Sequence, residues 1–297
     1  MDMVVRVARM PGAGETVRGE GFATSPGGKG ANQAVAAART GAKCIMLGRV
    51  GDDSFGRTLK EVLAVEAIDC DNVMVTPETS TGTAMILVDG LGENSIVISG
   101  GANQALTPDD IFPRGELFAL ADVVVLQLEI PLPTVRAAMD LARRHCCKIV
   151  LDPSPVTGRL PDELFAVDVI TPNAIEAEQI TGLQAGEERV DRQMASKLVE
   201  RGAGAAVLKM GGRGSLVVSA DGEIARVPAY RVNIVDTTGA GDAFTGALAV
   251  AAARGNCLAE AARIANAAGA LACMKFGAQA AIPTSDEIYM LMQDRRE

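Results

Sequence analysis

A stretch of small and acidic residues, 236-DTTGAGDAF-244, has the composition of an anion-binding helix start. The alanine-rich run 242–254 that follows predicts a helix ending at Gly255. Backbone N–H groups and the dipole at a helix N-terminus favour an anion, and small residues leave those groups accessible. Asp242 is open to two interpretations: a plain helix cap, or a base that takes a proton from the acceptor of an anionic group.

A second glycine-rich stretch, 27-GGKGANQ-33, also precedes a helix pattern. Its glycines let backbone N–H groups approach a polar ligand closely, while Lys29 and Asn32 offer side-chain hydrogen bonds. The same composition is equally compatible with an ordinary glycine-rich turn.

A third candidate, 173-NAIE-176, follows an apolar run. Asn173 and Glu176 lie one helical turn apart, so both side chains can face one cleft. The pair could organise water around Mg²⁺, which keeps most of its hydration shell. The alternative is that Glu176 stands near a helix start for electrostatic reasons alone.

Familiar nucleotide-binding and hydrolytic motifs are missing from the sequence. The 28-GKG-30 stretch lacks the flanking residues of a Walker A motif, and 239-GAGDAF-244 fails the last position of GxGxxG. His145 is the only histidine, beside Cys146 and Cys147, which argues against a zinc site or a Ser–His–Asp triad. If the chain handles ATP, it does so in another way.

The elements that position these stretches follow a βα rhythm. Short apolar runs ending in polar or glycine-rich turns predict strands within 43–51, 122–129, 147–152, 167–173 and 205–211. Helical patterns cover 31–41, 54–66, 132–145, 174–181 and 190–201. Buried parallel strands with crossover helices produce this alternation, and ligands then bind beyond the carboxyl ends of the strands. We expect a cleft lined by residues 127–129, 152–155, 171–173, 209–214 and 236–242.

Two segments break the rhythm. Residues 3–25 and about 76–100 are rich in strand patterns, with a hairpin turn at 89-DGLGEN-94. They predict a small β-layer on the α/β body that closes over a site, or else a decoration at the sheet edge.

The composition limits which classes of partner and which kinds of function the protein can have. The chain has 297 residues, a net charge of −9 and a pI near 4.9, which argues against nucleic acid or an anionic membrane as partner. No apolar run reaches the ~18 residues that span a bilayer, and the start lacks a signal-peptide pattern. Six cysteines without CxxC spacing suit reduced thiols. We expect a cytoplasmic protein.

Taken together and in this order, the motifs resemble the ribokinase family of sugar kinases, the PfkB-type carbohydrate kinases. The matching stretches are PGAGET (11–16), GGKGANQAVAAA (27–38), STGTA (80–84), GENSIVISGGAN (92–103), QLEIP (127–131), TPN-x-x-E (171–176), DTTGAGDAF (236–244), ANAAGALA (265–272) and GAQ (277–279). The resemblance implies a three-layer α/β ribokinase-like fold with a mostly parallel central sheet and a small β-sheet lid. The lid would comprise residues 1–26 and 76–103, and the body residues 27–75 and 104–297.

The resemblance also implies a role for each residue at a matching position. Asp242 would take the proton of the sugar's primary hydroxyl, with Gly239, Ala240 and Gly241 as the anion hole. The residues that would hold the sugar are Asp2, Gly28, Lys29, Gly30, Ala31, Asn32 and Glu129. Those that would hold ATP are Asn173, Lys209, Met210, Gly211, Gly212, Arg213, Gly214 and Asn266, with Glu176 helping to order Mg²⁺. A monovalent cation, usually K⁺, would lie near Asp236, Thr238, Ala272, Lys275, Gly277 and Ala281.

The implied activity is ATP-dependent phosphorylation of D-ribose at its 5-hydroxyl, by a homodimer joined through the lid. Alternatives are a kinase for deoxyribose, another sugar or a nucleoside, and an inactive, truncated sugar-binding remnant.

Three departures from the family pattern carry expectations of their own. Met1-Asp2 keeps only the aspartate of the usual first strand, so we expect the N-terminal strand of the main sheet to be missing. Lys209 and Met210 stand where Thr-Leu is common, which would alter phosphate contacts. Ala281 replaces a frequent serine, which would remove a cation ligand and weaken K⁺ dependence.

Overall fold

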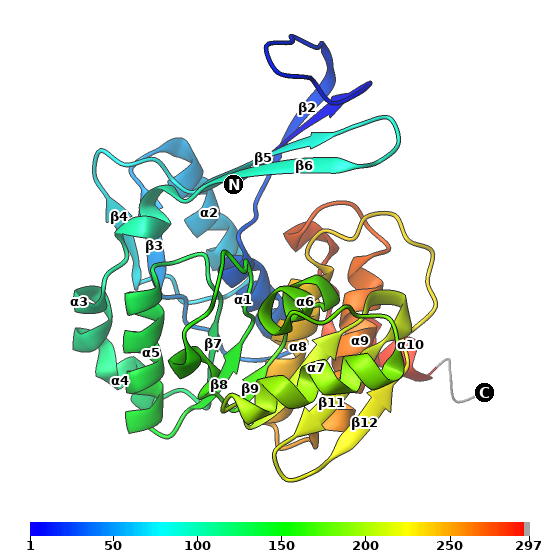
Figure 1. Ribbon diagram of the computed structural model, residues 1–297. Coiled ribbons are helices and arrows are strands. Elements are labelled where there is room, and N and C mark those ends of the chain that lie inside the picture. The colour runs from blue at the N-terminus through cyan, green and yellow to red at the C-terminus, as the bar shows by residue number, and fades with distance from the viewer. Residues whose placement is uncertain (294–297) are drawn as a thin grey trace.

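The computed structural model describes residues 1–293 and consists of an α/β body with a separate small sheet that projects from it (Figure 1). The body contains a six-stranded sheet in the order β12-β11-β10-β9-β8-β7. Its strands are β7 (Val123–Leu126), β8 (Lys148–Leu151), β9 (Val169–Ile170), β10 (Ala205–Lys209), β11 (Ser215–Ser219) and β12 (Ile224–Val227). Strands β7 to β10 are parallel, whereas β11 and β12 run antiparallel to their neighbours. The predicted mostly parallel sheet is confirmed.

Helices cover both faces of this sheet, because its strand residues alternate between two apolar clusters. Ile149 and Leu151 pack in the cluster of α5 (Leu132–Arg144) and α7 (Glu188–Glu200). Val150 and Val207 pack in the cluster of α8 (Ala240–Ala253) and α9 (Leu258–Ala272) on the opposite face. The result is the expected three-layer arrangement. The remaining helices are α1 (Lys29–Arg39), α2 (Ser54–Val65), α3 (Pro108–Ile111), α4 (Gly115–Ala119), α6 (Ala174–Thr181) and α10 (Ser285–Gln293).

A second, two-stranded parallel sheet lies apart from the main one. It pairs β3 (Gly48–Gly51) with β4 (Val73–Thr76), and it shares no ladder with the six-stranded sheet. The strand expected within 43–51 is therefore shorter, with only a bridge from Ile45 to Asp69 ahead of β3. Within residues 1–293, β3 and β7 each have one strand neighbour. The expected absence of an N-terminal strand from the main sheet stays a prediction.

The projecting sheet, which we call the lid, has the order β2-β1-β5-β6. Its strands are β1 (Asp2–Val7), β2 (Gly19–Ser25), β5 (Thr83–Val88) and β6 (Asn94–Ser99). Asp89 makes the hairpin turn between β5 and β6, because its Oδ1 accepts hydrogen bonds from the backbone N–H groups of Leu91 and Glu93. These strands fall inside 1–26 and 76–103, while the division into domains stays a prediction.

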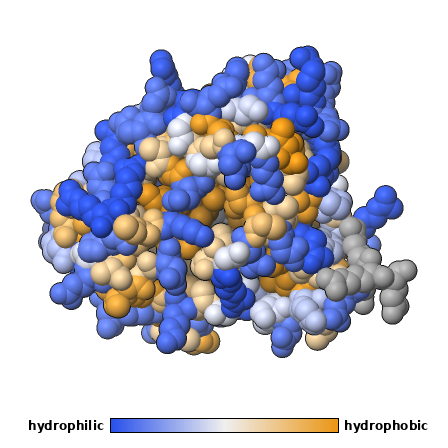
Figure 2. Space-filling view, turned by 90° about the horizontal axis from the view of Figure 1, so that it is seen from below, coloured by the Kyte–Doolittle hydropathy of each residue, from blue (hydrophilic) through white to orange (hydrophobic). Residues whose placement is uncertain are grey.

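The face turned away from the lid carries both hydrophobic and hydrophilic residues. Seen from below, apolar residues gather in its middle around a hollow, with hydrophilic residues at the rim (Figure 2). No helix in the part of the chain that the structure describes is long and apolar enough to cross a membrane.

Candidate active site

The site begins where α1 meets α8. Asn32 donates from Nδ2 to Oδ2 of Asp242 at 2.8 Å, and Gln33 donates from Nε2 to Oδ1 at 3.0 Å. Gly246 allows the two helices to approach, since a Cβ there would lie 2.5 Å from the Cβ of Ala36. The glycine-rich stretches that the sequence analysis singled out therefore lie together, although more than 200 residues separate them along the chain.

Asp242 occupies the first turn of α8, and the helix has no side-chain capping hydrogen bond. Gly239 is the N-cap residue, in a left-handed conformation with φ of 75°. A Cβ at Gly239 would come within 3.0 Å of the Cα of Ala278, so glycine suits this position on two grounds. Both carboxylate oxygens of Asp242 accept hydrogen bonds from side chains of another helix, and the residue is 6% exposed. This arrangement favours the base over the plain cap.

A charged cluster adjoins Asp242. Oε2 of Glu129 accepts a hydrogen bond from the backbone N–H of Lys29 at 3.0 Å, at the start of α1. The carboxylate of Asp2 lies over Gly27, where a Cβ would come within 2.2 Å of it. Asp2, Lys29 and Glu129 thus converge on the turn before α1, while their role in holding a sugar stays a prediction.

Burial and mutual charge shape the ionisation of this cluster. Burial raises the pKa of Asp2 and Glu129, and the nearby Asp242 carboxylate raises both further. The N-terminal ammonium acts against this rise at Asp2, and Lys29 acts against it at both groups. For Lys29, burial acts to lower the pKa, yet Asp242, Asp152 and other carboxylates outweigh it and raise the pKa. A polar ligand entering here meets the ammonium groups of Lys29 and of the N-terminus among several carboxylates.

Asn173 and Glu176 form a reciprocal capping box at the start of α6. The side chain of Asn173 accepts from the backbone N–H of Glu176 at 2.9 Å, and Oε2 of Glu176 accepts from the backbone N–H of Asn173 at 2.8 Å. The structural reading of Glu176 as a helix-start residue is therefore correct, and it leaves Oε1 outside the cap. A parallel bridge joins Asn173 to Lys209, which brings two of the expected strand ends together.

The 209–214 segment forms a tight loop between β10 and β11. Gly214 has φ of 84°, and a Cβ there would meet the carbonyl oxygen of Val227 at 2.0 Å. The side chain of Met210 packs in the hydrophobic core, so only its backbone faces the loop. Arg213 pairs with Asp191 on α7.

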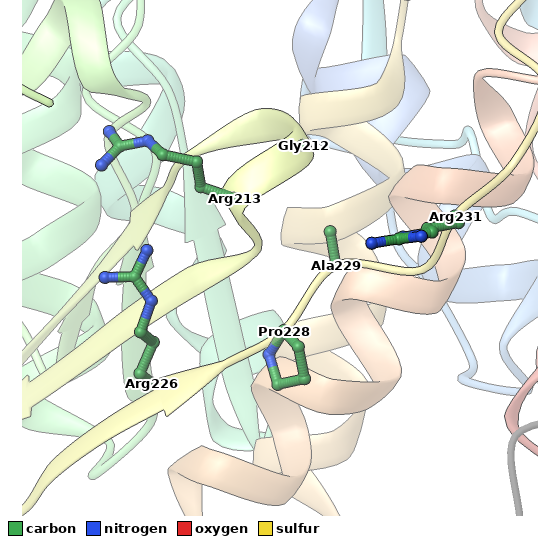
Figure 3. A pocket seen from close by; sticks show the side chains of 6 residues that line it. All are labelled: Gly212, Arg213, Arg226, Pro228, Ala229 and Arg231. Carbon is green, nitrogen blue, oxygen red and sulfur yellow. The ribbon is translucent and has the colours of Figure 1, made fainter.

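A pocket of about 540 Å³ opens beside this loop. Its lining residues are Gly212, Arg213, Arg226, Pro228, Ala229 and Arg231 (Figure 3). Asn266 on α9 fixes one wall, because its Nδ2 donates to the carbonyl oxygens of Val227 and Pro228, each at 3.2 Å. Of its three arginines, Arg213 and Arg226 form ion pairs with carboxylates of α7.

The loop before α8 is linked to the segment after α9. Oδ2 of Asp236 accepts from the backbone N–H of Gly277 at 3.0 Å, and Oδ1 accepts from the backbone N–H and hydroxyl of Thr238. Burial opposes ionisation, but these hydrogen bonds prevail and lower the pKa of Asp236. Gln279 is buried, and within residues 1–293 neither end of its amide has a hydrogen-bond partner.

Comparison of the chain with known protein families identifies its family. The family model for the pfkB family carbohydrate kinases matches residues 1–285. The chain belongs to this family.

Relatives of this PfkB-family chain include the ribokinase of Haemophilus influenzae, which is 38% identical over 96% of this chain and 93% of its own length. The deoxyribokinase of Salmonella typhimurium is 40% identical over 84% of this chain and 81% of its own length. Among solved structures, the ribokinase of Arabidopsis thaliana complexed with ribose and ATP has a TM-score of 0.92 at 30% identity, covering 98% of this chain and 95% of that one. The ribokinase-like fold is confirmed.

Sequence reasoning about this PfkB-family kinase missed two buried polar residues. The sequence patterns assign no role to Gln33 or to Asp152, although each lies in a predicted stretch, 27–33 and 152–155. In the structure Nε2 of Gln33 also donates to Oδ2 of Asp152 at 2.8 Å, and Lys209 donates to Oδ1 of Asp152 at 2.9 Å. An aspartate directly after an apolar strand was the available signal, but its partners lie on other elements.

Proposed function

We propose that this PfkB-family kinase transfers the γ-phosphoryl group of ATP to the 5-hydroxyl of D-ribose. The observation that carries the proposal is the carboxylate of Asp242. It is oriented by Asn32 and Gln33 in the first turn of α8, directly after the Gly239–Gly241 turn and beside the charged cluster. The relatives named ribokinase, at 35–38% identity over nearly the whole chain, support ribose as the acceptor.

The transfer follows from these positions. Asp242 accepts the proton of the 5-hydroxyl while that oxygen forms a bond to the γ-phosphorus, and the bond from phosphorus to the β,γ-bridging oxygen breaks to release ADP. Backbone N–H groups of Gly239–Gly241, with the α8 dipole, stabilise the charge on the transferring group. Asp2, Lys29 and Glu129 hold the other sugar hydroxyls.

ATP would lie along the strand ends, with its base towards the pocket beside the 209–214 loop. Asn266 holds one wall of that pocket, and Asn173 lies beside the end of β10. Glu176 is the carboxylate placed to order water around Mg²⁺. Mg²⁺ would neutralise phosphate charge during transfer. The donor set fits, because Mg²⁺ binds through few carboxylates and many waters.

The loop that Asp236 joins to Gly277 is the proposed site for K⁺. Main-chain carbonyl oxygens near the cation would come from Asp236, Thr238, Ala272, Lys275, Gly277 and Ala281. The buried amide oxygen of Gln279 is a further possible ligand, because it has no hydrogen-bond partner in the described chain. Oxygen donors suit such a cation, so the residues fit. Ala281 contributes no side-chain oxygen, so we propose a weaker K⁺ dependence than a serine would give.

A coupled ADP-release assay with a panel of sugars tests the function. We expect ribose to give the highest kcat/KM among ribose, deoxyribose, other pentoses and nucleosides. The deoxyribokinase relative makes deoxyribose the second candidate. A nucleoside preferred over both sugars would refute the proposed acceptor, and ADP release with none of them would refute the kinase reaction.

We also propose a homodimer through the lid, in the cytoplasm. Apolar side chains on the lid are exposed, including Phe22 at 67% and Val97 at 66%, which suits a surface covered by a second copy. Val97→Asp should convert a dimer to a monomer in light scattering; a monomeric wild type would contradict the proposal.

The proposed location rests on the cysteines. All six are free, which fits a reducing compartment.

A further inference from the structure

A buried network of polar side chains extends from Asp242 to Lys209. Nε2 of Gln33 donates to Asp242 at 3.0 Å and to Asp152 at 2.8 Å, so the two protons of one amide bridge two carboxylates. Lys209 then donates to Asp152 at 2.9 Å and to the hydroxyl of Thr245 at 3.4 Å. The members come from α1, α8 and the ends of β8 and β10.

The orientation of the Gln33 amide is fixed from its other end. Nε2 of Gln127 donates to Oε1 of Gln33, which turns the amide N–H groups towards the two aspartates. Gly30 leaves room for Gln127, because a Cβ at Gly30 would lie 3.1 Å from Oε1 of that residue. Gln33 is 2% exposed, so water does not compete for these bonds.

The charged groups in this network stabilise one another. Asp152 is 2% exposed, and an unpaired carboxylate at that depth would be costly. Burial raises the pKa of Asp152 to about 6, Glu176 and Asp242 act in the same direction, and Lys209 acts against them. The ammonium of Lys209 also lies 3.6 Å from where a Cβ of Gly241 would stand, beside the proposed anion hole.

We propose that Gln33 and the Lys209–Asp152 ion pair are positioning residues for Asp242, which hold its carboxylate in one orientation for proton transfer. This inference rests on the proposed function. Asn32 and Gln33 each bind a different oxygen of Asp242, which fixes the carboxylate plane. Lys209 pairs with Asp152, so the buried carboxylate that accepts from Gln33 is not left without a counter-charge.

The role is distinct from substrate binding, because Gln33 is bonded on every side by protein groups. Removing it should therefore lower kcat and leave KM for both substrates nearly unchanged. A misplaced catalytic group typically costs about 10- to 100-fold in rate, which is the loss we expect for Gln33→Met. Lys209→Met should give a similar loss of kcat, whereas Lys209→Arg, which keeps the charge, should recover most of it.

The decisive experiment is a double-mutant cycle measured with ATP and ribose. If Gln33 acts through Asp242, Gln33→Met should lower kcat about 10- to 100-fold in the wild type but less than twofold in the Asp242→Asn background. A purely structural role would lower kcat equally in both backgrounds and would overturn the inference. An unchanged kcat in the single variant would overturn it as well.

Two controls accompany the cycle. Gln193→Met places the same substitution at an exposed position of α7 and should leave kcat unchanged. Circular dichroism and ligand-induced thermal shifts show whether each variant is folded and binds ATP; a Gln33→Met variant that fails to fold transfers the test to Lys209→Met and Lys209→Arg. Absence of turnover in the wild type would refute the proposed function, whereas an active wild type with an additive cycle would refute only the positioning role.

Discussion

The two halves of the site use their side chains in opposite ways. In the acceptor half, around Asp242, Asn32 and Gln33, functional side chains bond to one another in a buried network. In the nucleotide half, around Asn173, Glu176 and the 210–214 loop, side chains cap a helix and fix loops, which leaves backbone groups and an open pocket to face a ligand. Chemistry needs a fixed orientation of few atoms, while a long ligand needs a shaped surface.

This difference predicts that substitutions in the two halves change different kinetic constants. Changes in the acceptor half should lower kcat with little change in KM, and changes in the nucleotide half should raise the KM for ATP or reduce stability. The following substitutions test that division.

Asp242→Asn should have the largest effect, lowering turnover by about 10²–10⁴ because the amide cannot take the hydroxyl proton. Steady-state kinetics with saturating ribose and ATP measure the loss. A decrease of less than tenfold would remove Asp242 from the role of base.

Gly239→Ala should come next, with a loss of about 10²–10³ in kcat, because a Cβ distorts the turn whose N–H groups stabilise the transferring group. Gly239 has φ of 75° and little space beside Ala278. Gly212→Ala is the matched control in the nucleotide half, where a Cβ meets nothing within 4 Å. Equal losses of kcat in the two variants would contradict the division.

Asn173→Ala should raise the KM for ATP about tenfold and change kcat less. It also breaks the capping box of α6, which typically costs about 1 kcal/mol of stability. Thermal unfolding together with ATP titrations separates the two effects. A variant with unchanged KM and a lowered Tm would make Asn173 a cap alone.

The smallest expected effect is the contribution of Asp152 to the pH dependence of folding stability. The folded-state pKa of Asp152 is raised to about 6, so the folded protein holds this proton more tightly than the unfolded chain. Stability from this group is therefore fully present below about pH 4 and is lost as pH rises to about 6. Denaturant unfolding at several pH values should show this decline in the wild type, and Asp152→Asn should remove it. An identical pH dependence in both proteins would show that Asp152 titrates normally.

Sequence patterns predicted the parallel strands β7 to β10 and helices such as α5 and α6 well, because each pattern depends on neighbouring residues. The relation of Asp242 to the 27–33 stretch required the family resemblance, since no local pattern links segments so far apart. Gln33 and Asp152 remained without roles because a buried hydrogen-bond network depends on the packing of α1 against α8. The separation of β3 and β4 from the main sheet likewise follows from pairing across the fold, which periodicity does not report.

The central claim is that Asp242 acts in chemistry and not in nucleotide binding. Isothermal titration of a non-hydrolysable ATP analogue with Mg²⁺ into the wild type and into Asp242→Asn tests it directly. The account predicts dissociation constants within about two- to threefold of each other, while turnover differs by orders of magnitude. A dissociation constant weakened tenfold or more in the variant would place Asp242 in the nucleotide-binding surface and would contradict the account.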